Sequence, residues 1–230
     1  MKFILLLFAF LLTGSCSHHN NYTRFVNSRQ SFVKIEMIAY KYPCESSVDC
    51  PDTFIVASGS GVRVMAKGKK YVLTAEHVCD TTEVTLAALE AGADINVDIY
   101  AIDLEQNRHK LDTVKKEPRF DLCLLRGPTL SIPAVRLSPR RPEIGEQVYN
   151  FASPVGIYGY NMAPILDGYY SGPYRGHAAY TIPAIGGSSG SPIVNKGGML
   201  VGMIHSVHNK FPYFSLSPTH EALVYFLFTD

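Results

Sequence analysis

Short apolar segments between turn-forming residues limit this chain's fold more than any other feature. Segments such as FVKIEMIAY, KYVLTA, QVYNFAS and GMLVGMIHSV are rich in β-branched and aromatic residues, which favours strands. Only THEALVYFLF, residues 219–228, has helical spacing, with Thr219 or Ser217 available as its cap. The stretch 81–92 fits either a helix or a strand. Many short strands and one terminal helix predict an all-β barrel or sandwich.

Length and composition indicate a globular protein with one large domain or two small barrels. The chain has 230 residues, of which 47% are hydrophobic and 18% charged, with a net charge of +1. It has no basic stripe, so we expect no nucleic-acid partner. The proline- and arginine-rich stretch SPRRPEIGE, residues 138–146, indicates a linker. We therefore predict an N-terminal domain over residues 33–137 and a C-terminal domain over 138–230.

The first fifteen residues, MKFILLLFAFLLTGS, have the features of an export signal. Lys2 supplies the positive start, an apolar run follows, and small residues end the segment. Cys16 comes next, so the segment resembles a bacterial lipoprotein signal, although Leu12 stands four places before the cysteine where three is usual. The resemblance implies a lipidated Cys16 that anchors the protein in the cell envelope. Cleavage and free secretion remain the alternative, and residues 16–32 are expected to be a polar tether.

Export would allow disulfides among the four remaining cysteines. Three pairings exist, and we favour Cys44–Cys50 because CESSVDC closes a short polar loop. Cys79 and Cys123 lie in apolar contexts, where buried free thiols are an equal alternative. CxxC and HExxH spacings do not occur in the sequence, so we expect no metal and no cofactor.

The stretch GGSSGSPIV, residues 186–194, has the form of a turn that carries a nucleophile. Glycine at position 187 allows a tight turn in which the N–H groups of Gly187 and Ser189 point into one site. Gly190 leaves room for a substrate. A flexible glycine-serine linker is the alternative, but a linker is not expected between two strands of a packed domain.

Two further residues complete the set that a nucleophilic serine needs. His77 ends an apolar strand segment and is the candidate base, and Asp121 heads the segment DLCLL and is the candidate acid. Taken singly, His77 is more simply a packed or surface imidazole, and Asp121 a strand-end cap. Asp98 and Asp103 are rival acids, ranked lower because their alternation fits a site beside His77 poorly.

Three windows, GSGVRV…KYVLTAEHVCD, RFDLCLL and GGSSGSPIVNKGGMLVGM, resemble the chymotrypsin-like serine peptidases, in particular the bacterial branch of glutamyl endopeptidases and Deg-type proteases. The resemblance extends over residues 33–228. It implies two packed six-stranded antiparallel β-barrels with a short C-terminal helix. His77 as base and Asp121 as orienting acid would come from the first barrel, and Ser189 as nucleophile from the second. The N–H groups of Gly187 and Ser189 would form the oxyanion hole.

The resemblance also indicates which residues would bind the substrate. Pro183 lies six places before Ser189, where an acid would give a preference for Arg or Lys, so that preference is not expected. Glutamyl endopeptidases carry a histidine at the position of Ile204, whereas here a histidine stands one place later. We expect a small or apolar pocket, and the residues predicted to bind substrate are Pro183, Ala184, Ile204, His205 and Ser206. For His205 and His208, packed or exposed imidazoles are the simpler interpretation.

These features predict an exported serine endopeptidase that cleaves protein or peptide substrates through an acyl-enzyme intermediate. Three alternatives stay open: a catalytically silent protease-like binding module, a lipid-anchored structural protein, and an esterase that uses the same site. The oligomeric state is not indicated by any feature of the sequence.

Overall fold

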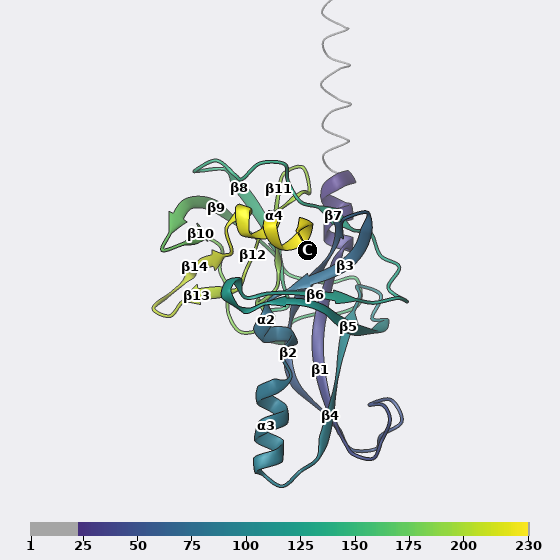
Figure 1. Cartoon of the computed structure of the whole chain (residues 1–230). Helices are drawn as coiled ribbons and strands as arrows, with labels where there is room; N and C mark the ends of the chain where they lie inside the picture. The colour runs from purple at the N-terminus through teal and green to yellow at the C-terminus, as the bar shows by residue number, and fades with distance from the viewer. Residues whose placement is uncertain (1–22, 230) are drawn as a thin grey trace, which may run out of the picture.

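A closed ring of antiparallel strands forms the first half of the chain in this computed structural model, which describes residues 23–229 (Figure 1). The sheet order is β1-β4-β5-β6-β3-β2-β7, and a further pairing of β1 with β2 closes β1 to β6 into a barrel. Strand β7 adds to β2 in parallel. The bounds are β1 Phe32–Lys41, β2 Thr53–Ala66, β3 Lys69–Thr74, β4 Ile95–Ile102, β5 Arg108–Glu117, β6 Leu122–Arg126 and β7 Val135–Arg136.

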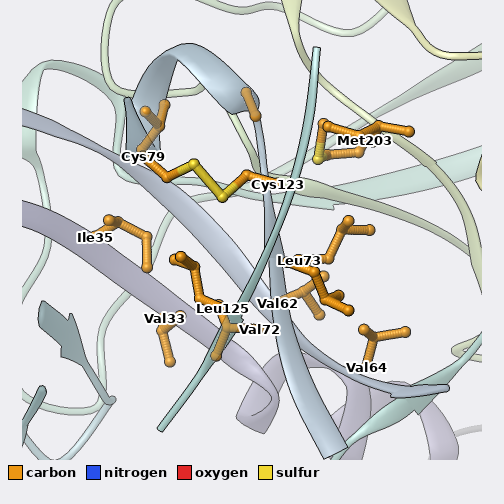
Figure 2. Packing of buried hydrophobic residues seen from close by; sticks show 14 of the residues in the cluster. Val33, Ile35, Val62, Val64, Val72, Leu73, Cys79, Cys123, Leu125 and Met203 are labelled. Carbon is orange, nitrogen blue, oxygen red and sulfur yellow. A yellow bond between two sulfur atoms is a disulfide. The ribbon is translucent and has the colours of Figure 1, made fainter. Parts of the chain in front are cut away.

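Aliphatic side chains fill this barrel (Figure 2). Each of them contributes about 1.5–3 kcal/mol when it is fully buried, and the β-branched ones also suit the pleated backbone. The cluster also takes in Leu200 and Met203, which belong to the second half of the chain. Members that are at most 2% exposed include Val33, Ile35, Val62, Val64, Val72, Leu73, Leu125 and Met203.

The second half forms a seven-stranded sheet that curls into a half-barrel, in the order β12-β11-β8-β9-β10-β14-β13. The predicted second closed six-stranded barrel is thus replaced by an open sheet, because its edge strands β12 and β13 are joined through the chain and not by a ladder. The two residues between these strands bond elsewhere, Ile204 N–H to Ser191 O and His205 N–H to Leu216 O. The bounds are β8 Gln147–Phe151, β9 Ile165–Tyr174, β10 His177–Tyr180, β11 Pro192–Asn195, β12 Leu200–Met203, β13 Ser206–His208 and β14 Phe211–Ser217.

Short helices occupy the connections, and one helix ends the chain. The expected terminal helix is confirmed as α4, whose cap Thr219 accepts a hydrogen bond from the Ala222 N–H. Its residues Leu223 and Phe226 pack into the core of the first barrel. The stretch 81–92, open in the sequence, forms α3, which buries no residue. The bounds are α2 Glu76–Cys79, α3 Thr82–Glu90, η1 Pro118–Phe120, η2 Pro154–Gly156 and α4 His220–Phe228.

The described part of the expected tether is folded onto the domain. Residues 23–30 are helical, and the ring of Phe25 lies 5.0 Å from that of Tyr149 and 5.5 Å from that of Phe151 in β8. The Arg29 guanidinium also donates to Asn161, so an aromatic contact and a polar one dock this helix on the second half of the chain. The predicted signal segment and Cys16 lie outside the described residues. Within the described part, no helix combines the length and the apolar character needed to cross a membrane.

The stretch 138–146, predicted as a linker, lies between β7 and β8 and has no strand or helix of its own. Just before it, Leu137 bridges Leu200 of β12, and the Ser138 N–H donates to Leu200 O. The linker thus starts only after the chain has reached the second sheet.

Candidate active site

His77 and Asp121 form a hydrogen-bonded pair at one end of the first barrel. The chain turns from β3 into the short helix α2, which carries His77, and His77 Nδ1 lies 2.8 Å from Asp121 Oδ2 and 3.0 Å from Oδ1. The His77 backbone N–H also donates to Oδ1, at 3.0 Å. The His77 side chain is 49% exposed and that of Asp121 21%. The His77 ring is therefore partly open to solvent, while the Asp121 carboxylate is more shielded.

Asp121 owes its orientation to an unusual backbone. Its φ of 52° and ψ of 51° are left-handed, a region that aspartate tolerates better than most residues. Asp121 follows the last residue of η1, and its N–H donates to the carbonyl of Pro118, the first residue of η1. Burial alone would raise the pKa of its carboxyl. Hydrogen bonds from the His205 and His77 rings, and from the His77 N–H, instead hold this pKa well below its usual range.

The pKa of His77 is shifted upward by the same contact. The hydrogen bond to Asp121 is the largest cause and raises it, partial burial opposes this, and the charges of Asp121 and Glu76 add to the rise. Because the carboxylate stabilises the imidazolium, His77 is a stronger base than an isolated histidine. With Nδ1–H donated to Asp121, Nε2 is the nitrogen left to accept a proton.

A disulfide ties the elements that carry this pair. Cys79 and Cys123 stand two residues after His77 and Asp121, and they are bonded to each other (Figure 2). The favoured pair Cys44–Cys50 is bonded as well. From the sequence alone, buried free thiols are an equal alternative for Cys79 and Cys123. Their disulfide fixes α2 against the first residues of β6.

The turn that carries Ser189 packs against the first barrel. Ser188 and Ser191 are fully buried, whereas Ser189 is partly exposed, so it is the serine of the three that a substrate can reach. The Ser189 carbonyl accepts a hydrogen bond of 2.8 Å from the Ser60 N–H. Gly190 has a φ of +84°, and a Cβ there would collide with Ser60 O and Thr74 Oγ1. Only glycine lets the turn approach this closely.

The backbone before Ser189 has the form of an oxyanion hole. Gly187 has a φ of +91°, and the carbonyl of Gly186 accepts a 2.7 Å hydrogen bond from the Val155 N–H. This peptide orientation turns the Gly187 N–H away from Val155. Within residues 23–229, the N–H groups of Gly187 and Ser189 have no hydrogen-bond acceptor in the protein. These two N–H groups can donate hydrogen bonds to an oxygen atom on which negative charge develops.

Ser60 holds this turn in place and was not predicted from the sequence. Its hydroxyl donates to Gly187 O at 2.8 Å and accepts from the Ser153 N–H at 3.1 Å, while its carbonyl accepts from Thr74 Oγ1 at 2.7 Å. With its N–H bonded to Ser189, a single buried residue of β2 connects both sheets. The signal was the serine inside GSGVRV, which a strand pattern alone would place among ordinary polar positions.

The histidine element and the serine turn meet across Gly59. A Cβ on Gly59 would lie 2.6 Å from Val78 Cγ1, the residue after His77, and 3.1 Å from Ser189 O. Among the described residues, however, no hydrogen bond joins Ser189 Oγ to His77. Contacts of this kind are often long in unliganded enzymes and tighten when the substrate binds.

The residues predicted to bind substrate lie in three different environments. Ile204 is 2% exposed and belongs to the core of the second sheet, so its side chain cannot line an open pocket. Pro183 and Ala184 line an apolar depression of about 260 Å³ with Pro154, Leu166, Ile185, Pro212 and Tyr213. Ser206 begins β13 and is partly exposed.

His205 departs most from the expected role. Its Nδ1 lies 3.5 Å from Asp121 Oδ2, so it faces the carboxylate of the pair. The rival acids are engaged elsewhere, Asp98 with Lys110 at 2.8 Å and Asp103 with His109 at 2.9 Å. Asp121 is thus the carboxylate that contacts His77.

Comparison with known proteins agrees with this architecture. The crystal structure of the serine endoprotease from Yersinia pestis superposes with a TM-score of 0.65 at 18% sequence identity, covering 89% of this chain and 64% of that one. The chain thus spans less than two thirds of that protein. The chymotrypsin-like all-β fold expected from the sequence is confirmed. No curated protein matches the chain significantly. The family model described as "trypsin-like peptidase domain" matches residues 59–203, from the glycine beside Ser60 to the end of β12. The chain therefore belongs to the family of trypsin-like peptidase domains.

Proposed function

We propose that this protein is a serine endopeptidase in which Ser189, His77 and Asp121 act as a catalytic triad. Ser189 Oγ attacks the carbonyl carbon of a peptide bond while His77 Nε2 takes its proton. The tetrahedral oxyanion receives hydrogen bonds from the Gly187 and Ser189 N–H groups. His77 then gives the proton to the leaving nitrogen, the C–N bond breaks, and water hydrolyses the acyl-enzyme ester by the reverse sequence of proton transfers.

One observation carries this proposal: a hydrogen-bonded imidazole–carboxylate pair lies beside a glycine turn whose two N–H groups are unpaired. A binding module has no need for unpaired donors next to a partly exposed hydroxyl. Asp121 holds His77 in the tautomer that leaves Nε2 free, and its charge stabilises the imidazolium that forms. The family match supports peptide bonds as the target.

Labelling with a fluorophosphonate probe tests the assignment. Wild-type protein should bind the probe covalently at Ser189, and Ser189→Ala should abolish both labelling and cleavage of a peptide library. Ser191→Ala is the matched control, since Ser191 is a buried neighbour in the same turn that bonds Asn150. Labelling that persists in Ser189→Ala would refute the proposal. Absence of labelling in a folded wild-type protein would instead favour a silent binding module or a structural protein.

We also propose that the protein is exported, with a lipidated Cys16 holding it at the cell envelope. The apolar run before Cys16 and the two disulfides support this, because disulfides persist in oxidising compartments. Cell fractionation with mass spectrometry of the mature N-terminus tests it. A diacylated Cys16 is expected. Protein with an unmodified mature N-terminus in the culture medium would favour free secretion. Protein that stays in the cytosol and still carries residues 1–15 would refute export.

A further inference from the structure

A second histidine extends the line of polar contacts behind Asp121. His205 lies between β12 and β13, is 12% exposed, and directs Nδ1 at Asp121 Oδ2 over 3.5 Å. Its other nitrogen, Nε2, lies 3.2 Å from Nδ1 of His177 on β10, and the two rings are 4.9 Å apart between centroids. The chain His77–Asp121–His205–His177 is therefore continuous, and both nitrogens of His205 are engaged.

We propose that His205 is a positioning residue for Asp121, and that His177 fixes it in the tautomer that donates to the carboxylate. The inference rests on the proposed function. A neutral imidazole has one donor and one acceptor nitrogen. If Nδ1–H faces the carboxylate, Nε2 must accept, and the Nδ1–H of His177 is the donor within reach. His205 therefore acts on the carboxylate and not on the side chain of a substrate.

The charges around this line are consistent with a neutral His177. Burial lowers the pKa of His177, and the nearby His205 lowers it further. On its outer side, His177 shares a pocket of about 50 Å³ with Arg141, His220 and Glu221. On the opposite side of the line, Glu76 of α2 acts on Asp121 and His77. Tyr170 and Tyr180 also line the pocket beside His177, and Lys116 of β5 pairs with Glu76 and Asp80.

The expected consequence is a carboxylate whose negative charge is shared between two rings. Without the donor at position 205, the whole charge of Asp121 acts on His77. The pKa of His77 would then rise further, and the neutral, active form would appear only at higher pH. The carboxylate would also lose one of the groups that hold it in place, so the base would be aligned less well.

Matched substitutions separate hydrogen bonding from packing. Asn and Leu have nearly the same shape, but only Asn has an N–H group near the place of His205 Nδ1. We expect His205→Leu to lower kcat about tenfold, as for a lost hydrogen bond to a charged group, with little change in KM. The acid limb of its pH profile should move to higher pH. His205→Asn should stay close to wild type in both respects.

His177→Leu tests the outer link. In the wild-type background it should shift the acid limb in the same direction as His205→Leu but less. In the His205→Leu background it should have no further effect, because the residue through which it acts is gone.

An NMR titration keeps this test independent of turnover. In the Ser189→Ala protein, the titration midpoint of the His77 ring should be higher with His205→Leu than with His205→Asn. If wild type fails to react with a fluorophosphonate, the proposed function fails, while this titration still tests the contact. Equal midpoints in the two variants would overturn the inference, as would an Asn variant as impaired as the Leu variant.

Discussion

Removal of the Cys79–Cys123 disulfide should cost more stability than removal of Cys44–Cys50, although each is a single bond. The first bond closes a loop with a sequence separation of 44, the second one of 6. By the loop-closure relation for the unfolded chain, these separations correspond to about 4 and about 2 kcal/mol. Cys79 and Cys123 are also buried, so Cys79→Ala/Cys123→Ala leaves a small void that adds to the loss.

The measurement is urea unfolding of both double variants in the Ser189→Ala background, which prevents self-digestion. Midpoints and slopes give the free energy of unfolding. With active protein, the Cys79→Ala/Cys123→Ala variant should also lose turnover, because α2 then has no covalent tie to β6 and depends on the His77–Asp121 contacts and the packing of Val78. The Cys44→Ala/Cys50→Ala control, in a loop far along the chain from these residues, should keep its kcat.

Equal losses of stability in the two double variants would refute this reasoning. So would an unchanged kcat in Cys79→Ala/Cys123→Ala, since it would mean that the three hydrogen bonds between His77 and Asp121 fix the pair without the covalent tie.

Three further predictions concern the site. The hydrogen bond to Asp121 raises the pKa of His77, so the acid limb of kcat/KM should have its midpoint above the ordinary histidine value of about 6.5. Asp121→Asn should lower that midpoint and should also lower kcat, by about 10⁴-fold. A midpoint below about 6.5 in the wild-type protein would contradict this prediction. Gly190→Ala should lower the free energy of unfolding by about 3 kcal/mol, because the φ is left-handed and the new Cβ collides with Ser60 and Thr74. Gly68→Ala is the control: its φ of +74° is similar but the space around it is open, so the loss in thermal or urea unfolding should be only about 1 kcal/mol. Ser60→Ala should lower kcat about tenfold by releasing the Gly187 carbonyl, while Ser58→Ala, at an exposed position of the same strand, should not change it in the same peptidase assay.

Local patterns predicted most of the strands and the terminal helix, because those elements follow from side chains that are neighbours along the chain. The segment around Tyr71–Thr74 became β3, and Thr219 caps α4 as expected. Motif spacing also indicated His77, Asp121 and Ser189, whose catalytic roles remain predictions. The second sheet was expected to close, but whether edge strands meet depends on the path of Ile204 and His205, which no local pattern reveals.

Contacts between distant segments were the part that sequence could not supply. The Cys79–Cys123 bond depends on how α2 lies against β6, a matter of three-dimensional packing. The hydrogen bonds of Ser60 to the carbonyls of Gly187 and Ser189 form only when both halves of the chain are folded together. For His205 the sequence offers a substrate-binding role or, more simply, a packed or exposed imidazole; its contact with Asp121 depends on the direction of the ring, which no local pattern reveals.

The two ends of the described chain are each docked on the opposite half of the molecule. Phe25 packs on β8 of the second sheet, and Phe226 of α4 lies in the core of the first barrel. Each half is thus held to the other by the terminal segment that it contributes, in addition to the linker. Proteolytic cleavage within 138–146 should leave the two halves associated. Neither half can unfold without losing the terminal segment that packs on the other, so heating should unfold both in one cooperative step.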